Sequence, residues 1–289
     1  MILLFDIGNT HTHIGLANDR RVLRQINVPT REWFGGKAKS QAAKFVGAKT
    51  INGAVLCSVV PRATPFVRKF VIQLGAPASS TARKKIHQHA GPEAGVPLLE
   101  LTPKTILGVG INYPKPNSIG PDRLANAVAA RKRFGAPVVV VDFGTAVTFD
   151  VVNRAGNYVG GIIAPGLAAM TDYLHEKTAL LPRIRIREIK TSIGKSTEQA
   201  MLIGAVHGYR GLVRELVAEL KRELKTKNLP VVATGGYAKL IAAKLPEISA
   251  VEPNLTLEGL RLTWAAARGH GHLQGTPQKL PRAMKLFTL

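Results

Sequence analysis

Two short turns in the sequence combine a carboxylate, a glycine and a hydroxyl, which together can grip a phosphate group. In DIGNT an apolar run ends at Asp6 and Thr10 closes the turn; in DFGT four valines precede Asp142 and Thr145 closes the turn. Backbone N–H groups at such turns, with the threonine hydroxyl, can face an anion. A carboxylate at a buried strand end can hold a hydrated cation beside phosphates. The residue types therefore point to phosphate chemistry.

The same unit of strand, turn and returning strand opens each half of the chain. It reads MILLFDIGNTHTHIGL at the N-terminus and VVVVDFGTAVTFDVV from Val138 to Val152. A plain hairpin would explain either turn alone, but a repeat at half-chain spacing indicates two similar domains that face each other, with one phosphate-binding turn apiece. The turn-rich stretch Asn112 to Gly120 predicts the boundary between them.

A third group of polar residues, GPDR, opens a predicted helix. Pro121 suits the first turn of a helix, and Gly135 suits its end. The start of a helix favours an ionised carboxylate, so Asp122 can accept a hydroxyl proton while Arg123 engages an acidic substrate. Phosphoryl transfer requires little beyond positioning, cations and such an acceptor.

The remaining elements must hold these residues in place. Apolar alternation predicts strands over 2–5, 13–17, 22–28 and 53–59, a helix over 40–46, a long amphipathic helix over 195–224, and a short buried strand within 230–236. The strand within 230–236 ends in a double glycine, which lets backbone approach a ligand. Strands are less clear over 84–110, where prolines interrupt the chain, and 268–289 is expected to be partly disordered.

Bulk composition limits the class of protein. The 289 residues suffice for two domains, 45% of them are hydrophobic, and no run reaches transmembrane length. The apolar N-terminus is too soon interrupted by Asp6 to be a signal peptide, so we expect a cytoplasmic protein. A single cysteine excludes an internal disulfide, and Cys57 resembles a small core residue.

The net charge of +22 raises the question of a nucleic-acid partner. The basic residues are dispersed, and at 6% aromatic residues the chain offers no evident stacking platform for bases. Solvated basic faces and an anionic substrate explain this charge better than a dedicated nucleic-acid site. GKST at 194–197 is no P-loop, because Ile189 stands where the upstream glycine is required.

Seven motifs, in order, resemble the type III pantothenate kinase family of the actin, acetate-kinase and heat-shock ATPase superfamily. They span Met1 to about Trp264 and read DIGNTHTHIGL, CSVVP, GPDRLANAVAA, DFGTAVTFD, GGIIAPGL, GKSTEQAM and ATGGYAKLI. The resemblance implies an α/β fold of two ribonuclease-H-like domains of the actin and sugar-kinase type, with an ATP cleft between them. The domains would be 1–116 and 117–267, followed by the basic tail 268–289.

The resemblance also implies a role for each matching position. Asp122 would be the proton acceptor for the primary hydroxyl of pantothenate, and Asp142 would bind a monovalent cation, K⁺ or NH₄⁺, in addition to Mg²⁺ at the site. The nucleotide would contact Asp6, Ile7, Gly8, Asn9, Thr10, His11, Thr12, His13 and Thr145, with Gly235 and Gly236 near the adenosine. The residues that would line the pantothenate pocket are Tyr113, Gly120, Pro121, Asp122, Arg123 and Thr197.

The implied function is ATP-dependent phosphorylation of pantothenate to 4′-phosphopantothenate, the first step of coenzyme A synthesis, in a homodimer without a membrane partner. Two alternatives remain open. One is a catalytically lapsed relative that acts in transcription or binds nucleic acid; the other is a kinase for a different small hydroxy acid. Retention of Asp6, Asp122, Arg123, Asp142 and Thr145 favours an active kinase. Pro121 and Phe143 depart from the family's common residues but suit their positions.

Overall fold

Two mixed β-sheets form the frame of the computed structural model, which describes residues 1–74 and 95–269. The first sheet contains β1 (Ile2–Ile7), β2 (His11–Ala17), β3 (Val22–Pro29), β4 (Gly53–Ser58) and β5 (Leu98–Glu100), in the order β3-β2-β1-β4-β5. Strands β1, β2 and β3 form an antiparallel meander, and β4 and β5 join β1 in parallel.

The second sheet repeats this plan. It contains β6 (Gly110–Ile111), β7 (Val138–Phe143), β8 (Ala146–Val152), β9 (Asn157–Pro165), β10 (Val231–Thr234) and β11 (Ala250–Val251), in the order β11-β10-β7-β8-β9-β6. Strands β7, β8 and β9 are antiparallel neighbours, and β10 and β11 follow in parallel. The two similar halves that the repeated turn predicted are thus confirmed, with β6 added beside β9.

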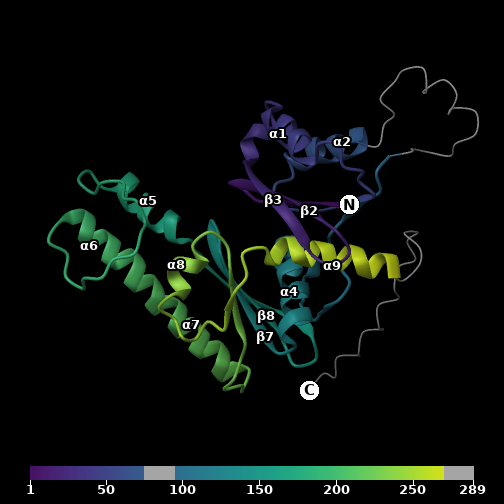
Figure 1. The fold of residues 1–289 in the computed structure, drawn as a ribbon. Helices are drawn as coiled ribbons and strands as arrows, with labels where there is room; N and C mark the ends of the chain where they lie inside the picture. The colour runs from purple at the N-terminus through teal and green to yellow at the C-terminus, as the bar shows by residue number, and fades with distance from the viewer. Residues whose placement is uncertain (75–94, 270–289) are drawn as a thin grey trace, which may run out of the picture.

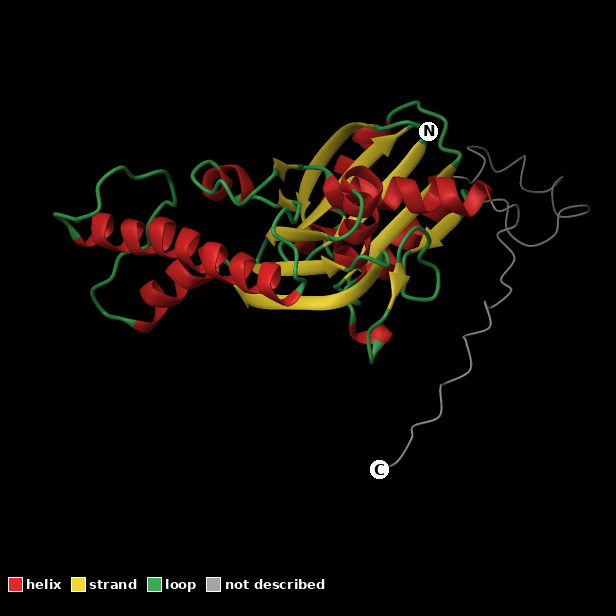
Figure 2. Ribbon diagram, turned by 90° about the horizontal axis from the view of Figure 1, so that it is seen from below, coloured by secondary structure: helices red, strands yellow, loops and turns green. Residues whose placement is uncertain are grey.

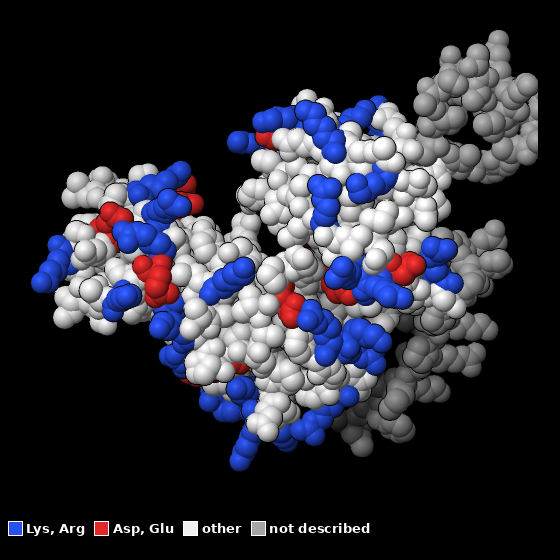
Figure 3. Space-filling model, in the orientation of Figure 1, with Lys and Arg blue, Asp and Glu red and all other residues white. Residues whose placement is uncertain are grey.

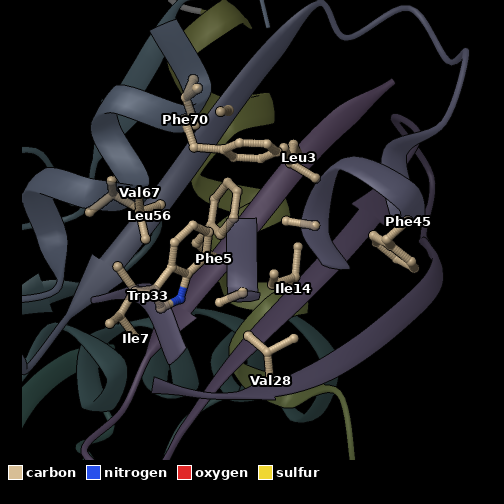
Figure 4. Close-up of a cluster of buried hydrophobic side chains, with 14 of the residues drawn as sticks. Leu3, Phe5, Ile7, Ile14, Val28, Trp33, Phe45, Leu56, Val67 and Phe70 are labelled. Atoms are coloured by element: carbon tan, nitrogen blue, oxygen red, sulfur yellow. The ribbon is translucent and has the colours of Figure 1, made fainter. Parts of the chain in front are cut away.

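Helices cover the outer face of each sheet. The first sheet carries α1 (Lys37–Val46) and α2 (Thr64–Leu74); the second carries α7 (Tyr209–Glu223) and α8 (Ala238–Ala242). Figure 4 shows the first of these cores, where the rings of Phe5, Trp33 and Phe70 lie 6.0–6.3 Å apart between centroids. Alternate residues of the strands supply this face, as a strand with both faces buried requires.

Two helices fill the space between the sheets. They are α4 (Pro121–Phe134) and α9 (Leu255–Gly269), which lie side by side in Figure 1. Ile2 and Leu4 of β1 pack on α9, while Val138 and Val140 of β7 pack on α4. A Cβ on Gly259 would lie 1.9 Å from the carbonyl oxygen of Ala125, so the two helices touch backbone to backbone. Helix α4 therefore holds its first turn between the two sheets.

A helical arm extends from the second sheet, at the left of Figures 1 and 2. It is built from α5 (Leu167–Lys177), α6 (Thr197–Ile203), a π-helical turn (Gly204–Gly208) and α7. The predicted amphipathic helix over 195–224 is present, with the π-turn in its middle. Short 3-10 turns at Thr30–Trp33 and Pro116–Ser118 complete the described elements.

Some expectations concern parts of the chain that carry no description. The undescribed residues 75–94 include 84–94, the first part of the proline-interrupted stretch. Residues 270–289 make up nearly all of the basic tail, so its predicted disorder lies outside the described residues. The division of the chain at residue 117 stays a prediction; β6 already pairs with the second sheet before that point. Within 1–74 and 95–269, none of the helices is long and apolar enough to cross a membrane. Figure 3 shows Lys and Arg side chains distributed over the visible face.

Gly53 provides a test of the packing between α9 and the first sheet. A Cβ at this position would lie 2.1 Å from the ring of Trp264, which is 2% exposed. Overpacking of this kind costs about 1–3 kcal/mol, so we expect Gly53→Ala to lower the melting temperature measured by circular dichroism. Gly211→Ala in α7 is the control, because a Cβ there meets no atom within 4 Å and alanine favours a helix by up to about 1 kcal/mol. Equal melting temperatures for the two variants would contradict this packing.

Candidate active site

The DIGNT and DFGT turns, which the sequence predicts to bind phosphate, meet between the sheets. The hydroxyls of Thr10 and Thr145 lie 3.1 Å apart and share a hydrogen bond across 135 positions of sequence. Asp6 and Asp142 occupy equivalent places. Each is the fifth residue of the central strand of its sheet, and each is half-buried while the other residues of its strand are buried. The repeat thus brings two carboxylates and two hydroxyls to one place.

Each turn is held in shape by its neighbours. In the first, the Thr30 hydroxyl donates to the carbonyl of Gly8 at 2.7 Å. In the second, a Cβ on Gly166 would lie 2.2 Å from the carbonyl oxygen of Thr145, so glycine is required at the start of α5. Gly235 has a φ of +88°, and a Cβ there would lie 2.5 Å from a carboxylate oxygen of Asp142. The first glycine of the double glycine therefore packs directly on Asp142.

Three carboxylates influence one another in this space. Burial raises the pKa of Asp6 and of Asp142 to about 7, and the negative charge of Asp122 adds to both shifts. Burial also raises the pKa of Asp122, while the backbone N–H of Arg123, 2.8 Å from its carboxylate, and the Arg123 guanidinium oppose that rise. Such mutual repulsion is relieved by a cation between the groups.

Two partners of these carboxylates escaped the sequence analysis. Asn126, 1% exposed, donates to Asp142 at 3.1 Å and accepts from the hydroxyl of Thr256 at 2.8 Å. The Cys57 thiol lies 3.4 Å from a carboxylate oxygen of Asp6. Asn126 follows Asp122 by one helical turn, so a polar residue in the alanine-rich stripe was the available signal. For Cys57, pairing of β1 with β4 was needed to bring it beside Asp6.

A second cluster surrounds Arg123 at the start of α4. Its Nε donates to Asp150 on β8 at 2.5 Å, and its guanidinium carbon lies 5.8 Å from the centre of the Tyr158 ring. Tyr113 packs edge-on against Tyr158 with centroids 6.3 Å apart. The predicted substrate residues Tyr113, Asp122 and Arg123 thus border one region, with Gly120 as the residue before α4 and Pro121 as its first residue.

Not every predicted residue presents its side chain to this space. Ile7 belongs to the core of the first sheet, and Thr12 is buried against Thr30 and Trp33, so only their backbone atoms can face a nucleotide. Asn9 and His11 are exposed, and His13 pairs with Asn27 at 2.7 Å. A Cβ on Gly236 would meet nothing within 4 Å. Thr197 is exposed and is the first residue of α6, which belongs to the arm and lies apart from α4 (Figure 1).

The residues suit a cation that is shared with phosphates. Within the described residues, no group of three or more His, Cys, Asp or Glu side chains lies close enough to hold a metal alone. Mg²⁺ commonly takes one or two carboxylates together with phosphate oxygens and water. Asp6 and Asp142, buried beside two hydroxyl-bearing turns, provide that incomplete set.

A cavity of about 540 Å³ opens beside the double glycine. Tyr237, which follows Gly236, lines it together with residues of α5 and the loop after it: Ala168, Thr171, Asp172, Arg183, Ile184, Arg185 and Ile186. The cavity adjoins the turn that packs on Asp142, and its volume is within the usual range for small-ligand pockets.

Solved structures share this fold at low sequence identity. A chain from Campylobacter jejuni named as a Baf family transcriptional activator matches with a TM-score of 0.54 and 16% identity over 92% of this chain and 99% of its own. A chain from Sinorhizobium meliloti named as a 2-dehydro-3-deoxygalactonokinase matches with a TM-score of 0.52 and 14% identity over 94% and 100%. These likenesses concern the two-domain α/β fold and confirm the predicted class.

Relatives found by sequence comparison are much more similar to this chain than these solved structures are. A chain from Akkermansia muciniphila named type III pantothenate kinase is 45% identical over 90% of this chain and 96% of its own. One of the same name from Methylacidiphilum infernorum is 40% identical over 90% of this chain and 87% of its own. The family model described as type III pantothenate kinase matches residues 2–219, which include both turns and GPDR. The chain therefore belongs to the type III pantothenate kinase family.

Proposed function

We propose that the space between the two sheets is where this pantothenate kinase transfers the γ-phosphoryl group of ATP to pantothenate, with Asp122 as proton acceptor. The observation that carries this proposal is the contact between Thr10 and Thr145, because it joins two phosphate-binding turns beside three carboxylates. Phosphoryl transfer depends mainly on such positioning and on charge stabilisation.

Asp122 suits the acceptor role by position. It lies in the first turn of α4, its carboxylate interacts with both Asp6 and Asp142, and its neighbour Arg123 is a cation. As the substrate oxygen bonds to the γ-phosphorus and the bond to the β-phosphate oxygen breaks, the hydroxyl proton passes to Asp122. A pKa raised by burial brings this carboxylate nearer to the working pH of a base.

The nucleotide would lie along both turns. The backbone N–H groups of the turn residues Asn9 and Thr10 and the hydroxyls of Thr10 and Thr145 would face its phosphates, and the adenosine would extend past Gly236 toward the cavity at Tyr237. Mg²⁺ neutralises charge on the transferring phosphates, and Asp6 and Asp142 are the side chains that would hold it. We further assign to Asp142 the monovalent cation, K⁺ or NH₄⁺, because its buried carboxylate needs a positive partner.

A homodimer is part of this proposal. Thr197 is the first residue of α6, and α6 lies apart from α4, whose first turn holds Asp122 and Arg123 (Figure 1). A second copy would then have to bring its own Thr197 toward the pantothenate pocket. The dispersed basic surface gives no support to a nucleic-acid site. A lapsed enzyme would be expected to have lost charged residues of the active site, and this chain retains them, which favours an active kinase.

Asp122→Asn tests the acceptor. We expect kcat to fall about 10²–10⁴-fold, as loss of a general base typically causes, while affinity for ATP changes little because Asp122 lies outside both phosphate turns. A coupled assay gives kcat, and calorimetry gives the ATP dissociation constant. Asp19→Asn, on the surface, is the control and should match the unaltered chain. Near-normal turnover of Asp122→Asn would make Asp122 a structural residue only.

The cation-binding role proposed for Asp142 and the phosphate-binding role proposed for Thr145 can be tested separately. Asp142→Ala should remove the dependence of activity on K⁺ together with most of the activity. Thr145→Ala should instead raise the KM for ATP and leave the K⁺ response in place, because it removes one hydroxyl from the phosphates. Titrations of K⁺ and of ATP against both variants measure this. If both variants share one defect, the turn acts as a single phosphate-binding unit and the assignment of the cation to Asp142 is wrong.

The raised pKa of Asp142 predicts how stability depends on pH without nucleotide. With a folded-state pKa of about 7, the folded chain binds more protons than the unfolded chain between about pH 4 and pH 7, so its stability increases as the pH falls through this range. Asp142→Asn carries no charge at any pH. We expect it to melt several degrees above the unaltered chain at pH 8, and we expect this advantage to shrink as the pH falls below about 7 and to disappear near about pH 4. Asp172→Asn, at an exposed carboxylate, should follow the unaltered chain throughout; a constant difference for Asp142→Asn would contradict the raised pKa.

A further inference from the structure

Asp150 is a buried carboxylate on β8, and Thr148, two residues before it on this strand, pairs with Asp142. Asp150 has no solvent exposure and accepts three hydrogen bonds. The Arg123 Nε and the Tyr158 hydroxyl donate to one oxygen at 2.5 and 3.2 Å, and the Thr148 hydroxyl donates to the other at 3.2 Å. Burial raises the pKa of Asp150 and the Arg123 guanidinium opposes that rise. A buried carboxylate is tolerated only when it is paired in this way.

Arg123 is fixed by this carboxylate and still has a free donor. Its side chain is 16% exposed, and its Nη2 is buried without a hydrogen-bond partner among the described residues. The guanidinium is a rigid planar fork, so a bond from Nε sets the direction of both Nη atoms. An unpaired buried donor costs free energy unless a ligand satisfies it.

Strand β9 leaves room around the guanidinium. A Cβ on Gly161 would lie 3.0 Å from the Arg123 Nη2 and 1.6 Å from the carbonyl oxygen of Phe149, and a Cβ on Gly160 would lie 3.2 Å from the Tyr113 ring. Two successive glycines therefore allow the guanidinium and the two tyrosine rings to come together. The result is a cationic donor held among aromatic rings at the start of α4.

We infer that Asp150 is a positioning residue that orients Arg123, so that Nη2 faces the carboxylate of pantothenate and sets the preference for an acidic substrate. This inference rests on the proposed function, which places pantothenate beside Arg123. Asp150 acts only through Arg123. Its carboxylate balances the positive charge of the guanidinium and prevents the guanidinium from rotating. Substrate discrimination between a carboxylate and a neutral group therefore depends on a residue that does not touch the substrate.

The test compares two compounds. One is pantothenate, and the other is its alcohol analogue, in which a hydroxymethyl group replaces the carboxylate. In Asp150→Asn, which keeps the shape and removes the charge, we expect the KM for pantothenate to rise about 10–100-fold, the loss of one hydrogen bond to a charged group. The KM for the alcohol and for ATP should change little, so the carboxylate preference collapses. Arg123→Gln should show the same collapse, and adding Asp150→Asn to it should cause no further loss.

Controls separate positioning from a general loss of packing. Glu258→Gln removes the carboxylate from another buried arginine, Arg261, whose side chain is 7% exposed, and should leave the ratio of the two substrates unchanged. Tyr158→Phe removes a single hydrogen bond to Asp150 and should shift the ratio in the same direction by a smaller factor, which decides the matter if Asp150→Asn does not fold. Equal losses for both compounds in Asp150→Asn or in Tyr158→Phe would overturn the inference.

Binding measured without ATP keeps the two proposals distinct. Calorimetry of pantothenate and of the alcohol reports on Arg123 and Asp150 whether or not turnover occurs. A chain that binds pantothenate with the expected preference but transfers no phosphate would overturn the proposed function and support the role of Asp150. A chain that phosphorylates pantothenate and the alcohol equally well would overturn the role of Asp150 alone.

Discussion

Burial of negative charge at the ends of two central strands is the constraint on which the site depends. Asp6 and Asp142 lie within reach of each other's field and of Asp122, and burial raises the pKa of each. A protein interior does not tolerate such a cluster without compensating positive charge. The cation that accompanies ATP at a kinase site would supply that positive charge, so the same carboxylates that destabilise the free protein would favour the cation-bound one.

The fold places this cluster by repeating one unit twice. Each sheet ends its central strand in an aspartate and then reverses through a turn that bears a threonine, and α4 and α9 hold the sheets so that the two threonine hydroxyls touch. Helix α4 starts in the same space, which brings Asp122 within electrostatic reach of Asp6 and Asp142. The roles proposed for these residues in phosphate binding, proton acceptance and substrate recognition thus all depend on the position of one helix between two sheets.

Much of this arrangement could be predicted from the sequence because the signals were local. The turns at Asp6 and Asp142, the proline and glycine that bound α4, and the valine run of β7 are recognisable without partners, although β2 begins at His11 rather than His13. Asp150, Cys57 and Asn126 escaped because their roles arise from strand pairing and from contacts between helices distant in sequence. Ile7 and Thr12 show the converse: a motif includes them, yet strand alternation turns their side chains into the core.

The central claim, that the two turns form one phosphate site, is tested most directly by hydrogen–deuterium exchange with and without Mg²⁺ and ATP. The account predicts that the amides of the turn residues 9–10 and 144–145, which lie between the paired strands, become protected together at the same nucleotide concentration, since both turns contact the same phosphates. Protection of only one turn, or of the two at clearly different concentrations, would contradict a shared site between the sheets.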